Sequence, residues 1–234
     1  MKSVKFRMIA IALLSATMPF TAKAQDKVEA SVGADFVSNY IWRGTDCGSV
    51  SIQPSMGVSY KGLSLTAWGS VGIDKEDARE IDLTLGYNTG GFSVSVTDYW
   101  FSYHKEDGGD SFKYGAHSTV HIFEAPLGYD FGPLALSWNT YFAGDDYTKE
   151  NGDRAYSTYV GISAPFKLGG LDWSAEVGLT PWEGAYANKF NVTNLTLKAE
   201  KEIKFTNSFS LPTFAQVTFN PHTQGAYFVF GVSF

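Results

Sequence analysis

The feature that most constrains the fold is a two-residue alternation of apolar and polar side chains that recurs along most of the chain. One example places Ile, Leu, Leu and Tyr at positions 81, 83, 85 and 87, between Glu, Asp, Thr and Gly at positions 80, 82, 84 and 86. Successive side chains of a β-strand point to opposite faces, so each such segment has one apolar and one polar face. The pattern therefore predicts an all-β protein.

The alternation predicts about twelve strands, most of them longer than the strands of soluble proteins. The predicted segments are 28–43, 49–60, 63–73, 79–87, 91–101, 115–131, 134–144, 154–166, 171–182, 190–205, 208–219 and 225–234. A tilted strand needs about 9–11 residues to cross a bilayer, whereas soluble strands average about 5–6. Short turns alternate with longer, charged or Gly-rich connections, which is typical of transmembrane barrels. We therefore expect a transmembrane antiparallel up-and-down β-barrel.

The first 24 residues have the composition of an export signal. A basic start is followed by an apolar run at 8–18 and by the small residues of Ala22-Lys23-Ala24. This order predicts a signal peptide at 1–24, read by the Sec-type export pathway, and a mature barrel at 25–234. The net charge of −6 becomes −10 after cleavage (14 Lys+Arg against 24 Asp+Glu), which argues against binding to nucleic acid. The single Cys47 excludes an internal disulfide framework.

The C-terminal segment 225–234 ends on phenylalanine after alternating apolar residues. It resembles the signal that outer-membrane barrels present to the barrel-assembly machinery, with Phe228, Phe230 and Phe234 as the candidate residues. The predicted location is therefore the cell outer membrane of a Gram-negative bacterium. There the apolar faces would contact lipid and lipopolysaccharide.

The polar faces of the same strands would line the inside of the barrel. The candidate pore-lining residues are Asp35, Arg43, Glu80, Asp82, Glu176, Lys198 and Glu200. Arg43 has two open interpretations, since it could project into the lumen near the outer mouth or extend to lipid phosphates. Eight-stranded barrels are filled by side chains and 16–18 strands leave a channel, so about twelve strands predict a narrow lumen. Its acidic balance predicts passive diffusion of cations or small neutral solutes.

No motif in the chain points to an enzyme, a cofactor or a metal centre. His117 and His121 are four residues apart, which would place them on one face of a regular strand, but without an acidic or Cys partner at metal spacing. Ser118 is adjacent to His117 and would face the opposite side, so the two cannot act as nucleophile and base. Asp98 interrupts the apolar face of its segment, which predicts a bulge near the rim.

One local motif supports a resemblance to a known family. Residues 37–44 read Val-Ser-Asn-Tyr-Ile-Trp-Arg-Gly, and they are followed by Gln53-Pro54 and Ala67-Trp68-Gly69. This N-terminal third resembles the start of the TorF-like porin family, also described as Gcw-type conserved outer-membrane proteins. The resemblance implies a barrel of similar strand number and a pore, but no particular solute.

Two other functions remain open from the sequence. The first is a non-conducting barrel that anchors or binds a partner, with its lumen filled by charged networks such as Lys198 with Glu200 or Glu80. The second is a soluble β-sandwich that binds carbohydrate on Trp and Tyr side chains.

Overall fold

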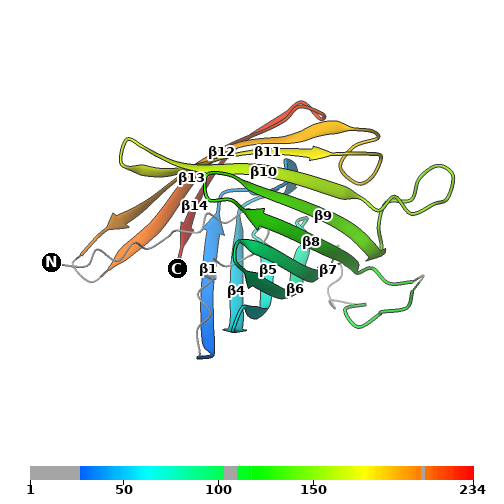
Figure 1. The fold of residues 1–234 in the computed structure, drawn as a ribbon, viewed down its shortest axis with the longest axis horizontal. Coiled ribbons are helices and arrows are strands. Elements are labelled where there is room, and N and C mark those ends of the chain that lie inside the picture. The colour runs from blue at the N-terminus through cyan, green and yellow to red at the C-terminus, as the bar shows by residue number, and fades with distance from the viewer. Residues whose placement is uncertain (1–26, 103–109, 117, 207–208) are drawn as a thin grey trace.

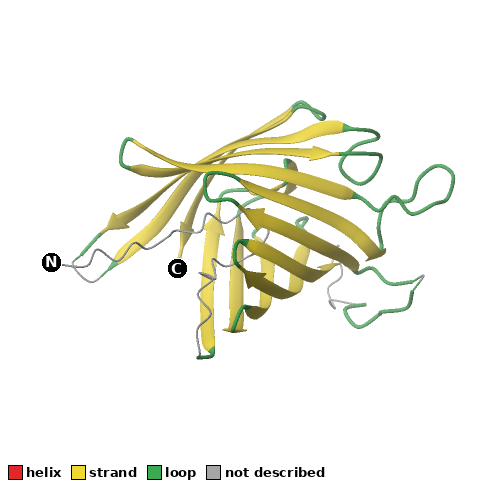
Figure 2. Ribbon diagram, viewed as in Figure 1, coloured by secondary structure: helices red, strands yellow, loops and turns green. Residues whose placement is uncertain are grey.

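The chain forms a single closed β-barrel (Figure 1). The computed structural model describes residues 27–102, 110–116, 118–206 and 209–234, so the predicted signal peptide lies outside the described residues. The barrel strands are β1 (Glu29–Val37), β4 (Ser51–Tyr60), β5 (Leu63–Gly72), β6 (Arg79–Thr89), β7 (Phe92–Ser102), β8 (Ile122–Asp130), β9 (Ala135–Gly144), β10 (Thr158–Leu168), β11 (Leu171–Thr180), β12 (Asn191–Lys204), β13 (Ser210–Asn220) and β14 (Gly225–Ser233). Figure 2 shows these strands joined by loops. Within the described ranges no helix is long and apolar enough to cross a membrane.

Closure is made by the pairing of the first and last barrel strands. β1 pairs antiparallel with β4 on one side and with β14 on the other, where Phe36 lies opposite Val232. All other barrel strands pair with their sequence neighbours. The prediction of a twelve-stranded antiparallel barrel is confirmed. The single closed sheet also means that the β-sandwich alternative is wrong.

The alternation of the sequence becomes an apolar outside and a polar inside. In β6, Ile81 and Leu85 are exposed, whereas Glu80 and Asp82 retain only 6% and 5% of their accessible surface. The side chains of Phe228, Phe230 and Phe234 are likewise exposed on the outer face. Each residue that the pattern assigned to one face of β6 or β14 therefore lies on that face.

The long connections gather at one end of the barrel, here called the long-loop end. They include residues 38–50, 73–78, 145–157 and 181–190. At the other end, here called the short-turn end, two-residue turns such as Lys61-Gly62 connect the strands. The loops drawn in green at the right of Figure 2 belong to the long-loop end.

Two predicted segments differ from the observed strands. The predicted strand 28–43 ends at Val37, because the chain bends at residues 38–39. Residues 40–48 then form a separate hairpin, in which Arg43 and Gly44 have positive φ angles of 51° and 81°. The predicted strand 115–131 begins only at Ile122, because Ser118 and Thr119 donate backbone hydrogen bonds to the carbonyl of Gly115 in a local turn. Elsewhere the observed bounds lie within a few residues of those predicted.

Candidate functional site

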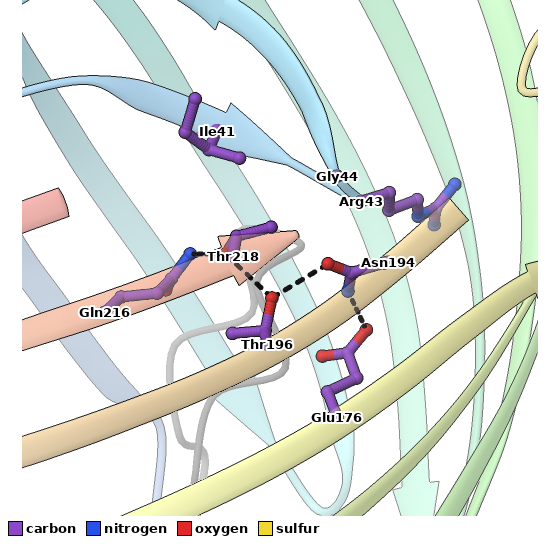
Figure 3. Close-up of a pocket in the computed structure, with 8 residues that line it drawn as sticks. All are labelled: Ile41, Arg43, Gly44, Glu176, Asn194, Thr196, Gln216 and Thr218. Atoms are coloured by element: carbon purple, nitrogen blue, oxygen red, sulfur yellow. Dashed lines mark hydrogen bonds between the residues drawn. The ribbon is translucent and has the colours of Figure 1, made fainter. Parts of the chain in front are cut away.

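A small hairpin occupies the lumen at the long-loop end. It consists of β2 (Tyr40–Trp42) and β3 (Thr45–Gly48), which pair antiparallel within the connection between β1 and β4. Ile41 and Arg43 are buried, and the side-chain amide of Asn220 on β13 donates a hydrogen bond of 3.0 Å to the carbonyl of Gly44. Figure 3 shows the tip of this lumen hairpin lying across β12 and β13. The connection therefore turns into the barrel instead of outwards.

The local sequence explains why the hairpin is so tight. Arg43 and Gly44 form a two-residue connection in which both φ angles are positive, as in a type I′ turn. A Cβ atom on Gly44 would lie 1.9 Å from the carbonyl oxygen of Thr193, so only glycine fits against the wall. A non-glycine residue with positive φ is uncommon, and Arg43 adopts this conformation with its side chain fully enclosed.

The Arg43 guanidinium forms a bidentate ion pair with Glu124 of β8. Its two nitrogens lie 2.5 Å and 3.0 Å from the two carboxylate oxygens, and Glu124 has no accessible surface. Tyr99 donates a further hydrogen bond of 2.7 Å to Glu124, and Arg43 donates one of 2.6 Å to the Tyr186 hydroxyl. The carboxylate is thereby satisfied by charge and by hydrogen bonds, as a buried ion requires.

Aromatic rings surround the guanidinium. Its carbon lies 4.2 Å from the ring centre of Trp42, 4.8 Å from that of Tyr159 and 5.8 Å from that of Tyr186. We call the wall residues Glu124, Tyr99, Tyr141, Tyr159 and Tyr186 the Arg43 cage; its four tyrosines form one buried cluster. Burial raises the pKa of Tyr186 to about 12, so its hydroxyl stays protonated at neutral pH.

A polar network continues from the cage towards β12 and β13. Tyr159 hydrogen-bonds to Glu176, and the Asn194 amide donates to both of these side chains. Gly178 permits this arrangement, because a Cβ atom there would lie 2.0 Å from the Tyr159 hydroxyl. The pocket drawn in Figure 3 is lined by Ile41, Arg43, Gly44, Glu176, Asn194, Thr196, Gln216 and Thr218. It holds space for only about one water molecule.

A family model described as "Bacterial protein of unknown function (Gcw_chp)" matches residues 21–211, which include the lumen hairpin and Glu124. The chain belongs to the Gcw_chp family. The Gcw-type resemblance seen in residues 37–44 and 67–69 is thereby confirmed. No match was found among curated proteins.

In this Gcw_chp barrel a second cluster lies beside the hairpin. The hydroxyl of Tyr40 hydrogen-bonds to Glu80, and the Tyr40 ring packs on Trp68 with ring centres 5.5 Å apart. Asp82 is buried next to Glu80, and one of its oxygens has no hydrogen-bond partner. Burial raises the pKa of the Cys47 thiol on the same hairpin. The contacts of Tyr40 hold the first strand of the hairpin, β2, against β5 and β6.

The remaining predicted lumen residues lie apart from the cage. Lys198 forms an ion pair of 2.6 Å with Glu200 on the same strand and lies 4.3 Å from the ring centre of Phe214. Asp35 lies in register with Gln53 and is half-buried. Of the seven predicted residues, four lie at the hairpin and three lie apart from it. Those at the hairpin are Arg43, Glu80, Asp82 and Glu176, and the others are Asp35, Lys198 and Glu200. Of the two interpretations of Arg43, the structure supports the lumen.

Sequence reasoning missed the residues that receive Arg43. Glu124 faces inwards on β8 like Gly128, but the alternation that assigns its face gives no sign of which distant residue it meets. Tyr99 and Tyr141 lie near strand ends, where the interface of a membrane barrel would also place tyrosines, so their positions alone do not indicate the cage. The Arg-Gly pair after the short apolar stretch 40–42 was the available signal for a tight hairpin.

Asp98 and His121 form an unexpected contact on the outer side of the Gcw_chp barrel. The His121 Nδ1 atom lies 2.7 Å from Asp98, and the ring stacks on Tyr114 with centres 4.3 Å apart. No register shift occurs at Asp98, so the bulge predicted there is wrong; the pairing of β8 with β9 shifts instead, with Phe142 of β9 as the extra residue. The prediction that His117 and His121 share a strand face is also wrong, since His121 precedes β8; His117 lies outside the described residues. Among the described residues, no group of three or more His, Cys, Asp or Glu side chains could hold a metal ion.

Proposed function

We propose that this chain is an outer-membrane β-barrel that acts as a narrow, gated channel for passive diffusion of small solutes, preferring cations. The observation that carries the proposal is a polar lumen blocked at one level by a hairpin that only non-covalent contacts hold. A barrel whose lumen is filled by the side chains of its wall would not need an additional hairpin to block it.

The outer face supports a membrane location. Large apolar side chains are exposed along the barrel strands, such as Val32 on β1, Leu85 on β6 and Phe228 on β14. In water this surface would favour aggregation, whereas in a bilayer it would contact lipid tails. The seam between β1 and β14, which pairs residues 34–38 with residues 230–234, closes the sheet into a barrel, as a lipid environment requires. The long-loop end would then face outwards, towards lipopolysaccharide.

The half of the lumen between the hairpin and the short-turn end supports conduction. Its wall carries small polar residues that face inwards and remain partly exposed: Ser55, Gly57, Thr84, Ser95 and Ser137. Water therefore reaches these residues from the short-turn end. Movement of the lumen hairpin away from the Arg43 cage would join this half of the lumen to the long-loop end.

The charge of the lumen supports a preference for cations. Among the described inward residues, buried or half-buried carboxylates outnumber the buried cations Arg43 and Lys198. These acids include Asp35, Glu80, Asp82, Glu124, Glu176 and Glu200. Fixed negative charge in a narrow pore raises the local concentration of cations and lowers that of anions.

Planar-bilayer recording tests the channel directly. The refolded wild-type barrel is compared with a variant in which residues 40–48 are replaced by a short Gly-Ser linker. We expect a several-fold larger conductance in the variant, with a reversal potential under a KCl gradient that indicates cation selectivity. The matched control replaces the exposed loop tip 149–152 with two glycines, and we expect no change.

The second candidate is a non-conducting barrel that anchors or binds a partner through its loops. The fully buried Arg43–Glu124 pair favours it, because such a pair is costly to separate. A hairpin-deleted barrel that keeps heat-modifiable gel mobility but shows no conductance would support this second function and overturn the channel.

A further inference from the structure

We propose that the Arg43 cage is a binding site for small solutes that carry a guanidinium group, and that such a solute displaces Arg43 and releases the lumen hairpin. The binding site stands on its own geometry. The release of the hairpin rests on the proposed channel function.

The cage already binds a guanidinium group, which the chain itself supplies. Glu124 receives the two nitrogens of Arg43 side by side, at 2.5 Å and 3.0 Å. This fork-to-fork geometry suits a planar guanidinium, whereas an ammonium ion offers only a point charge. The Tyr186 hydroxyl accepts a third hydrogen bond at 2.6 Å, which fixes the orientation of the plane.

Most of the groups that contact the guanidinium of Arg43 lie outside the hairpin. Glu124 lies on β8 and Tyr159 on β10, whereas Tyr186 lies in the 181–190 loop. Only Trp42, whose ring centre is 4.2 Å from the guanidinium carbon, would leave together with Arg43. After the hairpin has left, the site therefore still offers a carboxylate, a hydroxyl acceptor and a ring face to an incoming cation.

The charge of Glu124 couples solute binding to movement of the hairpin. Withdrawal of Arg43 leaves a carboxylate with no accessible surface and no cation partner. An unpaired buried charge strongly destabilises the state that contains it, so spontaneous withdrawal is rare. A solute guanidinium that pairs with Glu124 removes this penalty and stabilises the withdrawn state by mass action.

Chemical rescue with methylguanidinium tests the site. The Arg43→Ala variant of the full mature chain has an empty cage with Glu124 unpaired, and it should melt at a lower temperature than wild type. We expect methylguanidinium, at about tenfold its Kd, to raise that melting temperature by roughly 3–6 °C. Potassium and methylammonium chloride at equal ionic strength should raise it far less.

Two matched variants separate the cage from other effects. Arg79→Ala removes an exposed arginine at the start of β6 and should show no rescue. In Arg43→Ala/Glu124→Gln the carboxylate is absent, and rescue should disappear. Two results would overturn the site. The first is an equal rise in melting temperature with methylguanidinium in the double variant and in Arg43→Ala. The second is no rise in a folded Arg43→Ala variant. If Arg43→Ala folds poorly, its refolded yield becomes the readout: an increase with methylguanidinium supports the site, and no increase overturns it.

Bilayer recording of the wild-type barrel tests the release. Millimolar methylguanidinium should increase the open fraction several-fold, and potassium at equal concentration should not. If the hairpin deletion conducts but methylguanidinium neither opens the wild type nor rescues Arg43→Ala, the cation site fails and the channel stands. If rescue occurs but no variant conducts, the site stands and the channel fails.

Discussion

Arg43 and Glu124 lie 81 positions apart in the chain and meet inside the barrel in a bidentate ion pair. Arg43 comes from a hairpin in the connection between β1 and β4, and Glu124 comes from β8. Their contact joins the connection between the first two barrel strands to the barrel wall. Most of the experimental consequences of the structure depend on this pair.

The coupling between Arg43 and Glu124 should be large. A double-mutant cycle with Arg43→Ala and Glu124→Ala should give a coupling free energy of about 2–3 kcal/mol in urea unfolding, because each single change leaves a buried polar group unpaired. The control is the Lys167–Asp172 pair, where the lysine side chain is 78% exposed. Its cycle should give less than about 1 kcal/mol. Equal coupling in the two cycles would contradict the structure.

Gly44→Ala should displace the lumen hairpin. The added Cβ would overlap the Thr193 carbonyl oxygen, so the tip must leave the wall. We expect a red shift of tryptophan emission as Trp42 meets water, together with higher bilayer conductance. Gly169→Ala is the matched control, because Gly169 also has positive φ but its added Cβ would have no neighbour within 4 Å. The same emission shift in both variants would argue against the clash.

Cys47 should report the position of the hairpin. Burial raises the pKa of its thiol, so little of the reactive thiolate is present near pH 7, and the residue is half-buried on the lumen hairpin. Maleimide labelling should therefore be slow in the wild type and faster by at least about tenfold in Gly44→Ala. A Cys47→Ser/Asn151→Cys chain, with its thiol in an exposed loop, gives the unhindered rate. Labelling of wild-type Cys47 at that rate would contradict a lumen position.

A charge on the outer face should test contact with lipid. Leu85 lies near the middle of β6 with 59% of its surface exposed, and Leu85→Arg should lower the free energy of unfolding by about 2–4 kcal/mol in lipid vesicles. Phe112→Arg is the control, because Phe112 is 91% exposed but lies in a loop. If both variants keep wild-type stability in vesicles, the outer face does not contact lipid.

Phe234 should matter for assembly and not for stability. Its backbone pairs with Ala34, whereas its side chain points outwards and is exposed. Phe234→Ala should therefore refold in detergent like the wild type but reach the outer membrane of cells in several-fold lower amount. Phe219→Ala, which removes another exposed outward aromatic, should assemble normally. Normal insertion of Phe234→Ala would contradict the assembly signal.

The sequence by itself determined the barrel and the orientation of its side chains. Alternation in β6 assigned Glu80 and Asp82 to one face and Ile81 and Leu85 to the other, and the structure agrees. This works because strand geometry is local: neighbouring side chains must point in opposite directions whatever surrounds them. The same local rule fixed the short turns and hence the pairing of sequence neighbours.

Only the tertiary structure decided that residues 40–48 enter the lumen and that Arg43 meets Glu124. Two inward residues can meet across a barrel only if strand stagger, bulges and loop paths bring them to one level, and none of these is a local property. Strand alternation turns Glu124 inwards, but the path of the 38–50 connection brings Arg43 to it, and the backbone of Thr193 sets the fit of Gly44. Contacts between distant segments therefore placed the hairpin.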